Sequence, residues 1–218
     1  MLGEEIIRKV VVKLEEFSPY APDHEDAGPL LSGQDKLEEI KPIYSYIEDT
    51  LPQAANEMLL IAPLDKLEIE RADHRVCIHE YEKRTIGTVC TVSLPDDFLR
   101  LCSIRLGSWS HSVRKAEHAN SVLAREQDNE WDMGVFTKPV VVLDSNLMYC
   151  YSVAPGAQYT VSEFRYVPTF SLIGEYNDNI AELIALNCAK KVYEIFQNVE
   201  GVTLIEKEIK SSLELLTL

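Results

Sequence analysis

The chain has 218 residues, 46% hydrophobic and 26% charged, which is enough apolar material for a sizeable core and argues against intrinsic disorder. Its formal net charge of -15 and its lack of clustered Lys and Arg argue against a protein whose main task is to grip nucleic-acid phosphates. The acidity is explained by solubility, or by a ring whose bore must not adhere to DNA.

The N-terminal segment lacks the basic start and long apolar run of a signal peptide, and no stretch approaches the roughly 20 apolar residues of a membrane span. Five scattered cysteines are interpreted as reduced, semi-buried small hydrophobic residues: Cys77, Cys90, Cys102, Cys150 and Cys188. We therefore expect a protein made in the cytoplasm, without a membrane partner.

Apolar residues at helical spacing predict a helix over residues 3–17. Residues 18–33 hold three prolines and two glycines and are interpreted as a long exposed arm. A second helix is expected after a cap at Asp35, with a kink or break at Leu51-Pro52 and a further helical segment over 54–60.

From about His74 the composition shifts to β-branched and aromatic residues, which favour strands. Strands are predicted over residues 76–81, 85–92, 101–106, 140–143, 147–153 and 159–166. Turns are expected at Asp144-Ser145-Asn146 and at Ala154-Pro155-Gly156.

A polar stretch from His111 to Asp132 interrupts the strands, and residues 116–124 within it are expected to form a short helix. Trp109 and Trp131 flank this stretch. Two alternatives stay open for these tryptophans: they pack the segment against the sheet, or they project into a neighbouring subunit.

The strongest helical pattern begins at a cap, Asn177 or Asp178. Gly201 is expected to end this helix, and a second amphipathic helix follows. The sequence thus predicts an α+β protein. Its N- and C-terminal helices pack as a bundle (1–72 and 174–218), and its β-rich middle (73–173) is an antiparallel sheet or a small sandwich.

A search for chemistry finds no glycine-rich phosphate loop, no dinucleotide-binding fingerprint and no cysteine pair at zinc-site spacing. Ser112 and Lys115 match a Ser-x-x-Lys pattern without its companion motifs. The run Asp23-His24-Glu25-Asp26 could hold a metal, but a solvated charged turn explains it more simply.

Histidines beside carboxylates give the remaining enzyme candidates. His79 and Glu80, near His74, would point to opposite faces of a strand, which spoils a joint site. Glu117 and His118 lack a nucleophile. We therefore predict no enzyme, with catalytic, cofactor-binding and metal-binding residues all absent; a hydrolase with an unrecognised site around these histidines is the enzyme alternative.

The ten tyrosines divide between predicted helices and predicted strands. Tyr44 and Tyr46 lie on a helix, and four others lie on strands: Tyr149, Tyr151, Tyr159 and Tyr166. The simpler interpretation is that these tyrosines pack in the core and on the sheets. The alternative is that they anchor an interface with another protein.

Three local patterns, spread over residues 37–200, resemble one family. They are IEDTLPQA at 47–54 with LLIAP at 59–63; LPDDFLRLCSI at 94–104 leading to Trp109; and REQDN at 125–129 with KPVV at 138–141 and NIAELIAL at 179–186. The chain is similar in these to the head-to-tail connector proteins of tailed bacteriophages, closest to the tail tubular and ring proteins of podoviruses, including crAss-like phages.

The resemblance implies a virion structural protein, located at the tail or neck of the particle and made in the host bacterial cytoplasm. It would form a ring, with twelve-fold symmetry expected, beneath the portal protein. The ring would contact other tail or ring proteins and enclose DNA without reading its sequence. The alternative is another non-enzymatic virion or scaffold protein.

Overall fold

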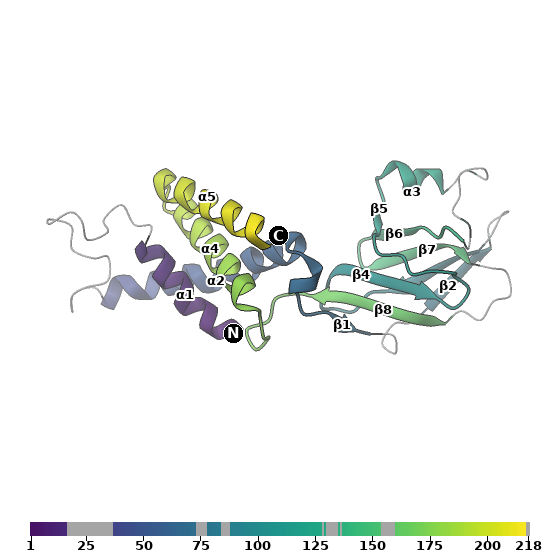
Figure 1. Ribbon diagram of the computed structural model, residues 1–218, viewed down its shortest axis with the longest axis horizontal. Coiled ribbons are helices and arrows are strands. Elements are labelled where there is room, and N and C mark those ends of the chain that lie inside the picture. The colour runs from purple at the N-terminus through teal and green to yellow at the C-terminus, as the bar shows by residue number, and fades with distance from the viewer. Residues whose placement is uncertain are drawn as a thin grey trace. The chain divides into compact units, whose positions relative to one another are not determined.

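The computed structural model describes residues 1–16, 37–72, 78–83, 88–127, 129, 135, 137–153 and 160–216 (Figure 1). The fold is α+β, as expected, with helices at both ends and a β-rich middle. The chain divides into two compact units: Met1–Glu68 with Thr169–Leu218, here the helical unit, and Ile69–Pro168, here the β-rich unit. From the sequence these boundaries are expected after residues 72 and 173.

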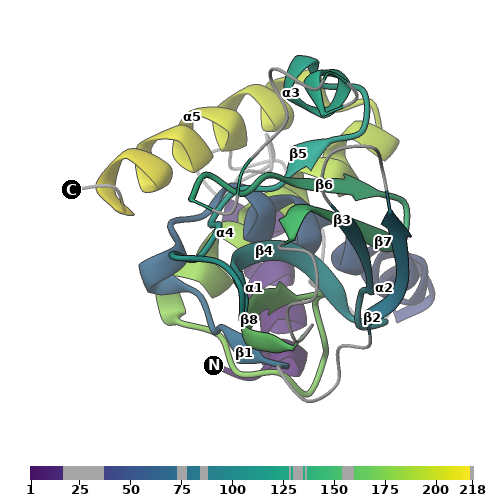
Figure 2. The ribbon, with the colours of Figure 1, turned by 90° about the vertical axis from the view of Figure 1, so that its right-hand side faces the viewer.

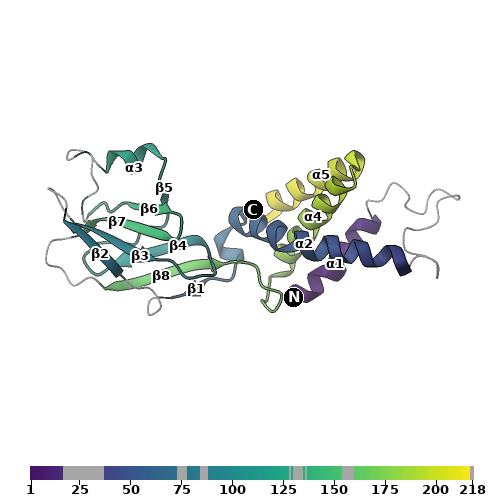
Figure 3. The same ribbon diagram turned by 180° about the vertical axis from the view of Figure 1, so that it is seen from behind.

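The helical unit is built around α4 (Asp178–Ile195). Three other helices pack on it: α1 (Gly3–Glu16), α2 (Leu37–Ile61) and α5 (Val199–Leu216). Figure 1 shows α5 in front of α4, and Figure 3, from behind, shows α2 in front of it. Because neighbours surround α4, eleven of its residues are buried, whereas α5 buries a narrow stripe: Gly201, Ile205, Ile209 and Leu216.

The expected cap of α4 is confirmed at Asn177, whose side chain accepts a hydrogen bond from the Asn179 backbone N–H at 3.0 Å. Of the kink or break expected at Leu51-Pro52, the break is wrong, because α2 continues through it to Ile61. Leu51, Ala54 and Ala55 on either side of the proline are buried. Their packing offsets the cost of about 3 kcal/mol that an interior proline carries.

The expected end of a helix at Gly201 is also wrong, since α4 ends at Ile195 and Gly201 lies inside α5. The turn between them uses Gln197, whose φ of 58° is left-handed, and Asn198, whose side chain accepts from the Gly201 N–H at 3.0 Å. A Cβ on Gly201 would lie 3.1 Å from the ring of Tyr193. The glycine therefore permits close helix packing.

The β-rich unit contains two sheets that share a core. Of the two expected alternatives, an antiparallel sheet or a small sandwich, it is therefore a small sandwich. One has the order β1-β8-β4, and the other β2-β3-β7-β6-β5. The strands are β1 (Glu70–Arg71), β2 (Ile78–Lys83), β3 (Thr88–Ser93), β4 (Phe98–Leu106), β5 (Glu117–His118), β6 (Val141–Asp144), β7 (Leu147–Val153) and β8 (Val161–Pro168). All neighbouring strands are antiparallel except β5 and β6.

The inner faces of the two sheets share one core (Figure 2). Phe164 and Tyr166 of β8 meet Cys90, Met148 and Cys150 of the other sheet there. The Tyr166 hydroxyl donates to Asp97 Oδ1 at 2.7 Å, so its buried polar end is satisfied. Trp109 is 2% exposed and belongs to this core, which settles its role in favour of packing.

The predicted strands are present, with ends shifted by a few residues, and the turn at Asp144-Ser145-Asn146 is confirmed, with Ser145 at φ 55°. The short helix expected near 116–124 is present but lies further along the chain. Residues 117–118 form β5, and α3 is Val122–Glu126. Its start is fixed by Ser121, whose hydroxyl accepts from the Ala124 N–H at 3.1 Å.

Candidate functional site

Three charged residues of α4 are each paired with a different neighbouring helix. Glu182 contacts α1 through Lys9 and Lys13, at 2.6 and 2.8 Å. Lys191 contacts Glu57 of α2 at 2.8 Å, and Lys190 contacts α5. Such pairs on packed helices fix which helices are neighbours and in what register, so these charges serve the fold.

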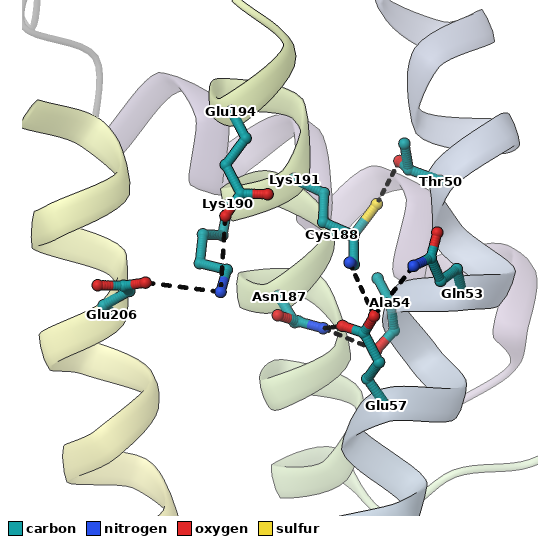
Figure 4. Close-up of polar contacts among 10 residues, drawn as sticks. All are labelled: Thr50, Gln53, Ala54, Glu57, Asn187, Cys188, Lys190, Lys191, Glu194 and Glu206. Atoms are coloured by element: carbon teal, nitrogen blue, oxygen red, sulfur yellow. Dashed lines mark hydrogen bonds and ion pairs between the residues drawn. The ribbon is translucent and has the colours of Figure 1, made fainter. Parts of the chain in front are cut away.

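A buried amide lies beside the Lys191 pair (Figure 4). Asn187, 2% exposed, donates to the Ala54 carbonyl at 2.9 Å and to Glu57 Oε2 at 3.1 Å. Burial raises the pKa of Glu57, but hydrogen bonds from Lys191 and Asn187 and the charge of Lys191 lower it by more. Glu57 therefore stays ionised, which suits a structural ion pair better than proton transfer.

A groove of about 380 Å³ opens between α5 and the helices beneath it. Its lining mixes apolar and charged side chains: Met58, Asn187, Lys190, Glu206, Ile209, Lys210, Leu213 and Glu214. Lys190 is paired with Glu206 at 3.6 Å and with Glu194 at 3.7 Å, while Asn187 is satisfied by α2 (Figure 4). Among the described residues, no serine, cysteine or histidine lines this groove, so no Ser–His or Cys–His pair is found there.

Solvent-exposed aromatic and aliphatic side chains lie where α2 contacts the turn between α4 and α5. Tyr46 and Phe196 contact each other edge to face, with ring centroids 5.4 Å apart, and are 38% and 54% exposed. Ile195 and Val199 beside them are 46% and 75% exposed. We call these four side chains the aromatic patch. Exposed apolar clusters of this kind mark interaction sites.

The exposed charged residues near the aromatic patch in the sequence are acidic. Within four residues of its members, the exposed charged side chains of the described helices are all carboxylates: Glu48, Asp49, Glu194 and Glu200. Exposed aromatic side chains such as Tyr46 and Phe196 are enriched at protein–protein interfaces. The patch is therefore the candidate functional site of the helical unit.

The structure does not bring the weaker enzyme candidates together. The Ser112 hydroxyl donates to Glu163 Oε2 at 2.6 Å, while Lys115 pairs with Glu117 at 3.0 Å, so Ser112 and Lys115 serve different partners. His118 is exposed, and its Nδ1 accepts from the Asn120 N–H at 3.2 Å. Each polar group has a local structural contact.

Other candidates lie outside the described residues: the run Asp23-His24-Glu25-Asp26, the arm 18–33, the cap at Asp35, His74, Cys77, Trp131, Tyr159 and the turn at 154–156. The backbone of His79 and Glu80 belongs to β2, but their side chains lie outside the description. In the part of the chain that is described, no three His, Cys, Asp or Glu side chains gather closely enough to hold a metal.

Some tyrosines pack in the core and others are exposed, where they could anchor an interface. Tyr151 and Tyr166 on strands are buried, whereas Tyr44 and Tyr46 on α2 are exposed. Sequence reasoning named Tyr46 as a possible anchor but missed Phe196 and Val199, because both fall on apolar positions of predicted amphipathic helices. Had the end of α4 been placed at Ile195 instead of at Gly201, Phe196 and Val199 would have been assigned to the turn between α4 and α5 and not to a buried helix face.

Cys90, Cys102, Cys150 and Cys188 are free and buried, as expected for reduced small hydrophobic residues. Among the described helices, none combines the length and apolar composition that crossing a membrane requires. Comparison of the sequence with protein-family models and with curated proteins finds no match.

Proposed function

We propose that this chain is a structural subunit of a tailed-bacteriophage virion: a head-to-tail connector that forms a ring, of twelve copies, between the portal protein and the tail. Its place is the neck of the particle, where it contacts portal and other tail or ring proteins and surrounds the DNA channel. It works by self-association and performs no bond-making chemistry.

The aromatic patch is the observation that carries this proposal. A monomer gains nothing from leaving Phe196 and Val199 more than half exposed. Aromatic side chains at the centre of an interface contribute most of its binding energy. Glu182, Lys190 and Lys191 of α4 are meanwhile engaged in ion pairs between helices, which favours a scaffold over a catalyst.

The distribution of charge also supports a channel-lining role. The helical unit contains 10 Lys and Arg against 23 Asp and Glu, and the β-rich unit 11 against 13. A ring that exposes the acidic unit to its bore would repel the DNA backbone and leave the strand free to move.

Imaging and light scattering of the purified full-length protein, alone and with portal rings, test the proposal. We expect closed rings, and complexes with portal. Phe196→Glu should weaken ring formation, because it buries a charge in the interface. Leu215→Glu is the matched control, since Leu215 is 72% exposed in the same unit and lies near the far end of α5.

A wild-type protein that stays monomeric at all concentrations and ignores portal would contradict the proposal. Rings or smaller oligomers that ignore portal would favour the alternative, another virion or scaffold protein. Equal loss of assembly in both variants would show that the aromatic patch has no special part in it.

A further inference from the structure

The turn that leads into α4 presents aliphatic side chains to solvent. Leu172 and Ile173 in this turn are 46% and 82% exposed. Leu2, 44% exposed, lies beside the turn, because its backbone forms a β-bridge with Glu175. Figures 1 and 3 both show the N-terminus next to this segment. We call Leu2, Leu172 and Ile173 the aliphatic knob. Single exposed aliphatic side chains are normal, whereas several at one place mark an interaction site.

Hydrogen bonds to the start of α1 hold the backbone of the knob in place. The N–H groups of Gly3 and Glu4 donate to the carbonyls of Gly174 and Leu172, each at 3.0 Å. These carbonyls satisfy donors that the first turn of a helix leaves without a partner. A Cβ on Gly3 would lie 2.6 Å from the Ser171 carbonyl oxygen. Glycine therefore permits the close approach of α1 to the turn.

The other side of the turn is held by Tyr176. Its hydroxyl accepts from the Ser171 N–H at 2.8 Å and donates to the Ser171 carbonyl at 3.1 Å. The Tyr176 ring stacks on Phe170, with centroids 5.3 Å apart, and the Phe170 N–H donates to Asn56 Oδ1 of α2 at 2.8 Å. Because α1, α2 and Tyr176 all hold the turn, the knob loses little conformational freedom when it binds a partner.

The aliphatic knob and the aromatic patch lie at opposite ends of α4. The knob precedes Asp178, the first residue of the helix, while the patch includes its last residue, Ile195, and Phe196 after it. At a rise of about 1.5 Å per residue, the 18 residues of α4 separate the two by about 27 Å. The two apolar surfaces of one copy therefore cannot cover each other.

We infer that the aliphatic knob of one copy docks onto the aromatic patch of the next. A second copy is the partner that accounts for both surfaces, because every copy carries one knob and one patch. The partly exposed rings of Tyr46 and Phe196 offer apolar area against which Ile173 packs.

Such a contact joins different surfaces of the two copies, so it repeats head to tail. It closes into a ring when the rotation between copies permits. The inference rests on the proposed ring function and names the contact that would close the ring.

A second copy fits the knob better than a lipid surface does. The helical unit, which carries the knob, has 23 acidic residues against 10 basic ones, and the negative surface of an anionic membrane would repel it. Insertion of the knob into lipid would also leave the aromatic patch, at the other end of α4, without a partner.

Mixing two full-length variants tests the contact. Ile173→Glu removes the knob and keeps the patch, whereas Phe196→Glu removes the patch and keeps the knob. Each variant alone should self-associate about a hundredfold more weakly than wild type, because a charge replaces an apolar anchor. An equal mixture should form a complex of one chain of each kind and stop there, because that pair has one intact knob and one intact patch. Light scattering and sedimentation measure both results.

The matched controls are Ile173→Leu and Leu215→Glu. Ile173→Leu keeps the knob aliphatic, and Leu215→Glu adds the same charge at another exposed position of the helical unit, so both should assemble like wild type. Ile173→Ser, expected to lose about tenfold, repeats the test without an added charge. Because Ile173 is 82% exposed, its substitution should leave the monomer folded, which circular dichroism verifies.

Rings of Ile173→Glu as stable as those of wild type would overturn this contact and leave the ring proposal standing. A wild-type chain that never assembles overturns both. Two monomeric variants that do not combine on mixing would show that knob and patch do not meet. Stable dimers of Ile173→Glu alone would indicate a patch-to-patch contact and overturn the inference. Wild-type binding to phosphatidylcholine vesicles that Ile173→Glu abolishes, with assembly unchanged, would overturn it in favour of lipid.

Discussion

The two units of this protein stabilise themselves in different ways. In the helical unit a single apolar helix, α4, is surrounded by the others. Three of its charged residues each pair with a different neighbour: Glu182 with α1, Lys191 with α2 and Lys190 with α5. In the β-rich unit the strands come from distant parts of the sequence and share a core that is almost free of charge. Both units have packed cores, but only the helical unit joins its elements through ionised side chains. The stability of the helical unit should therefore depend on pH more than that of the β-rich unit.

The largest expected effects come from cutting into either core. Phe164→Ala in the β-rich unit should lower its free energy of unfolding by about 3–5 kcal/mol, and Leu183→Ala in α4 should lower that of the helical unit by about 2–5 kcal/mol. Both tryptophans lie in the β-rich unit, so their fluorescence follows it, while circular dichroism at helical wavelengths follows the other.

Each substitution should shift one signal far more than the other during urea unfolding. If both signals shift together for either variant, the units unfold as one, and the contrast between them fails. Val122→Ala, at a 64% exposed position, provides the baseline for a harmless truncation.

A smaller effect is expected from the buried amide. Asn187→Ala removes the amide's hydrogen bonds to the Ala54 carbonyl and to Glu57 Oε2 and opens a void beside α2, at a cost of about 1–3 kcal/mol. Lys190→Ala removes only partly exposed ion pairs and should cost less than about 1 kcal/mol. Equal costs, measured by urea unfolding, would show that the amide does not hold α2 on α4.

Acid should weaken the helical unit first. Burial raises the pKa of Glu182, but hydrogen bonds and charges from Lys13 and Lys9 lower it by more, and the pKa of Glu57 is lowered too. A carboxyl whose pKa is lower in the folded state stabilises the fold at pH values above its unfolded pKa, near 4.5. That stability is lost as pH falls through the folded pKa.

Thermal unfolding between pH 6 and 3 should therefore show a steep loss of the helical signal in wild type and a shallower one in Glu182→Gln, which is already less stable at neutral pH. Glu15→Gln, at an exposed position of α1, should keep the wild-type slope. Parallel slopes for wild type and Glu182→Gln would refute the structural role of this carboxylate.

The smallest effect concerns the thiols. Burial raises the pKa of Cys90 and of Cys188 to about 11, and it also raises that of Cys150 and Cys102. At pH 8 a thiol with that pKa is a thiolate about one part in a thousand. A Cys77→Ser variant should accordingly show no fast reaction with a thiol reagent until it is unfolded. Fast labelling of the native variant would reveal opening of one unit, and the labelled cysteine would identify which.

Much of the fold could be predicted because its signals are local. The apolar spacing and the Asn177 cap located α4, and the Asp144-Ser145-Asn146 turn located the β6–β7 hairpin. The failures share one cause, which is that tertiary packing outweighed a local preference. Buried neighbours carried α2 past Pro52, and close contact with Tyr193 required Gly201 inside α5 instead of at the end of α4.

By itself the sequence determined the α+β class, the order of the elements, an acidic composition and the buried character of the four described cysteines, because periodicity and composition act over a few residues. Tertiary structure alone decided which helix Glu182, Lys190 and Lys191 of α4 each meet. It also decided that Trp109 belongs to the core and that Tyr46, Phe196 and Val199 stay exposed. The reason is physical: a periodic pattern says which face of a helix is apolar, but only the positions of all neighbouring elements decide how much of that face they cover.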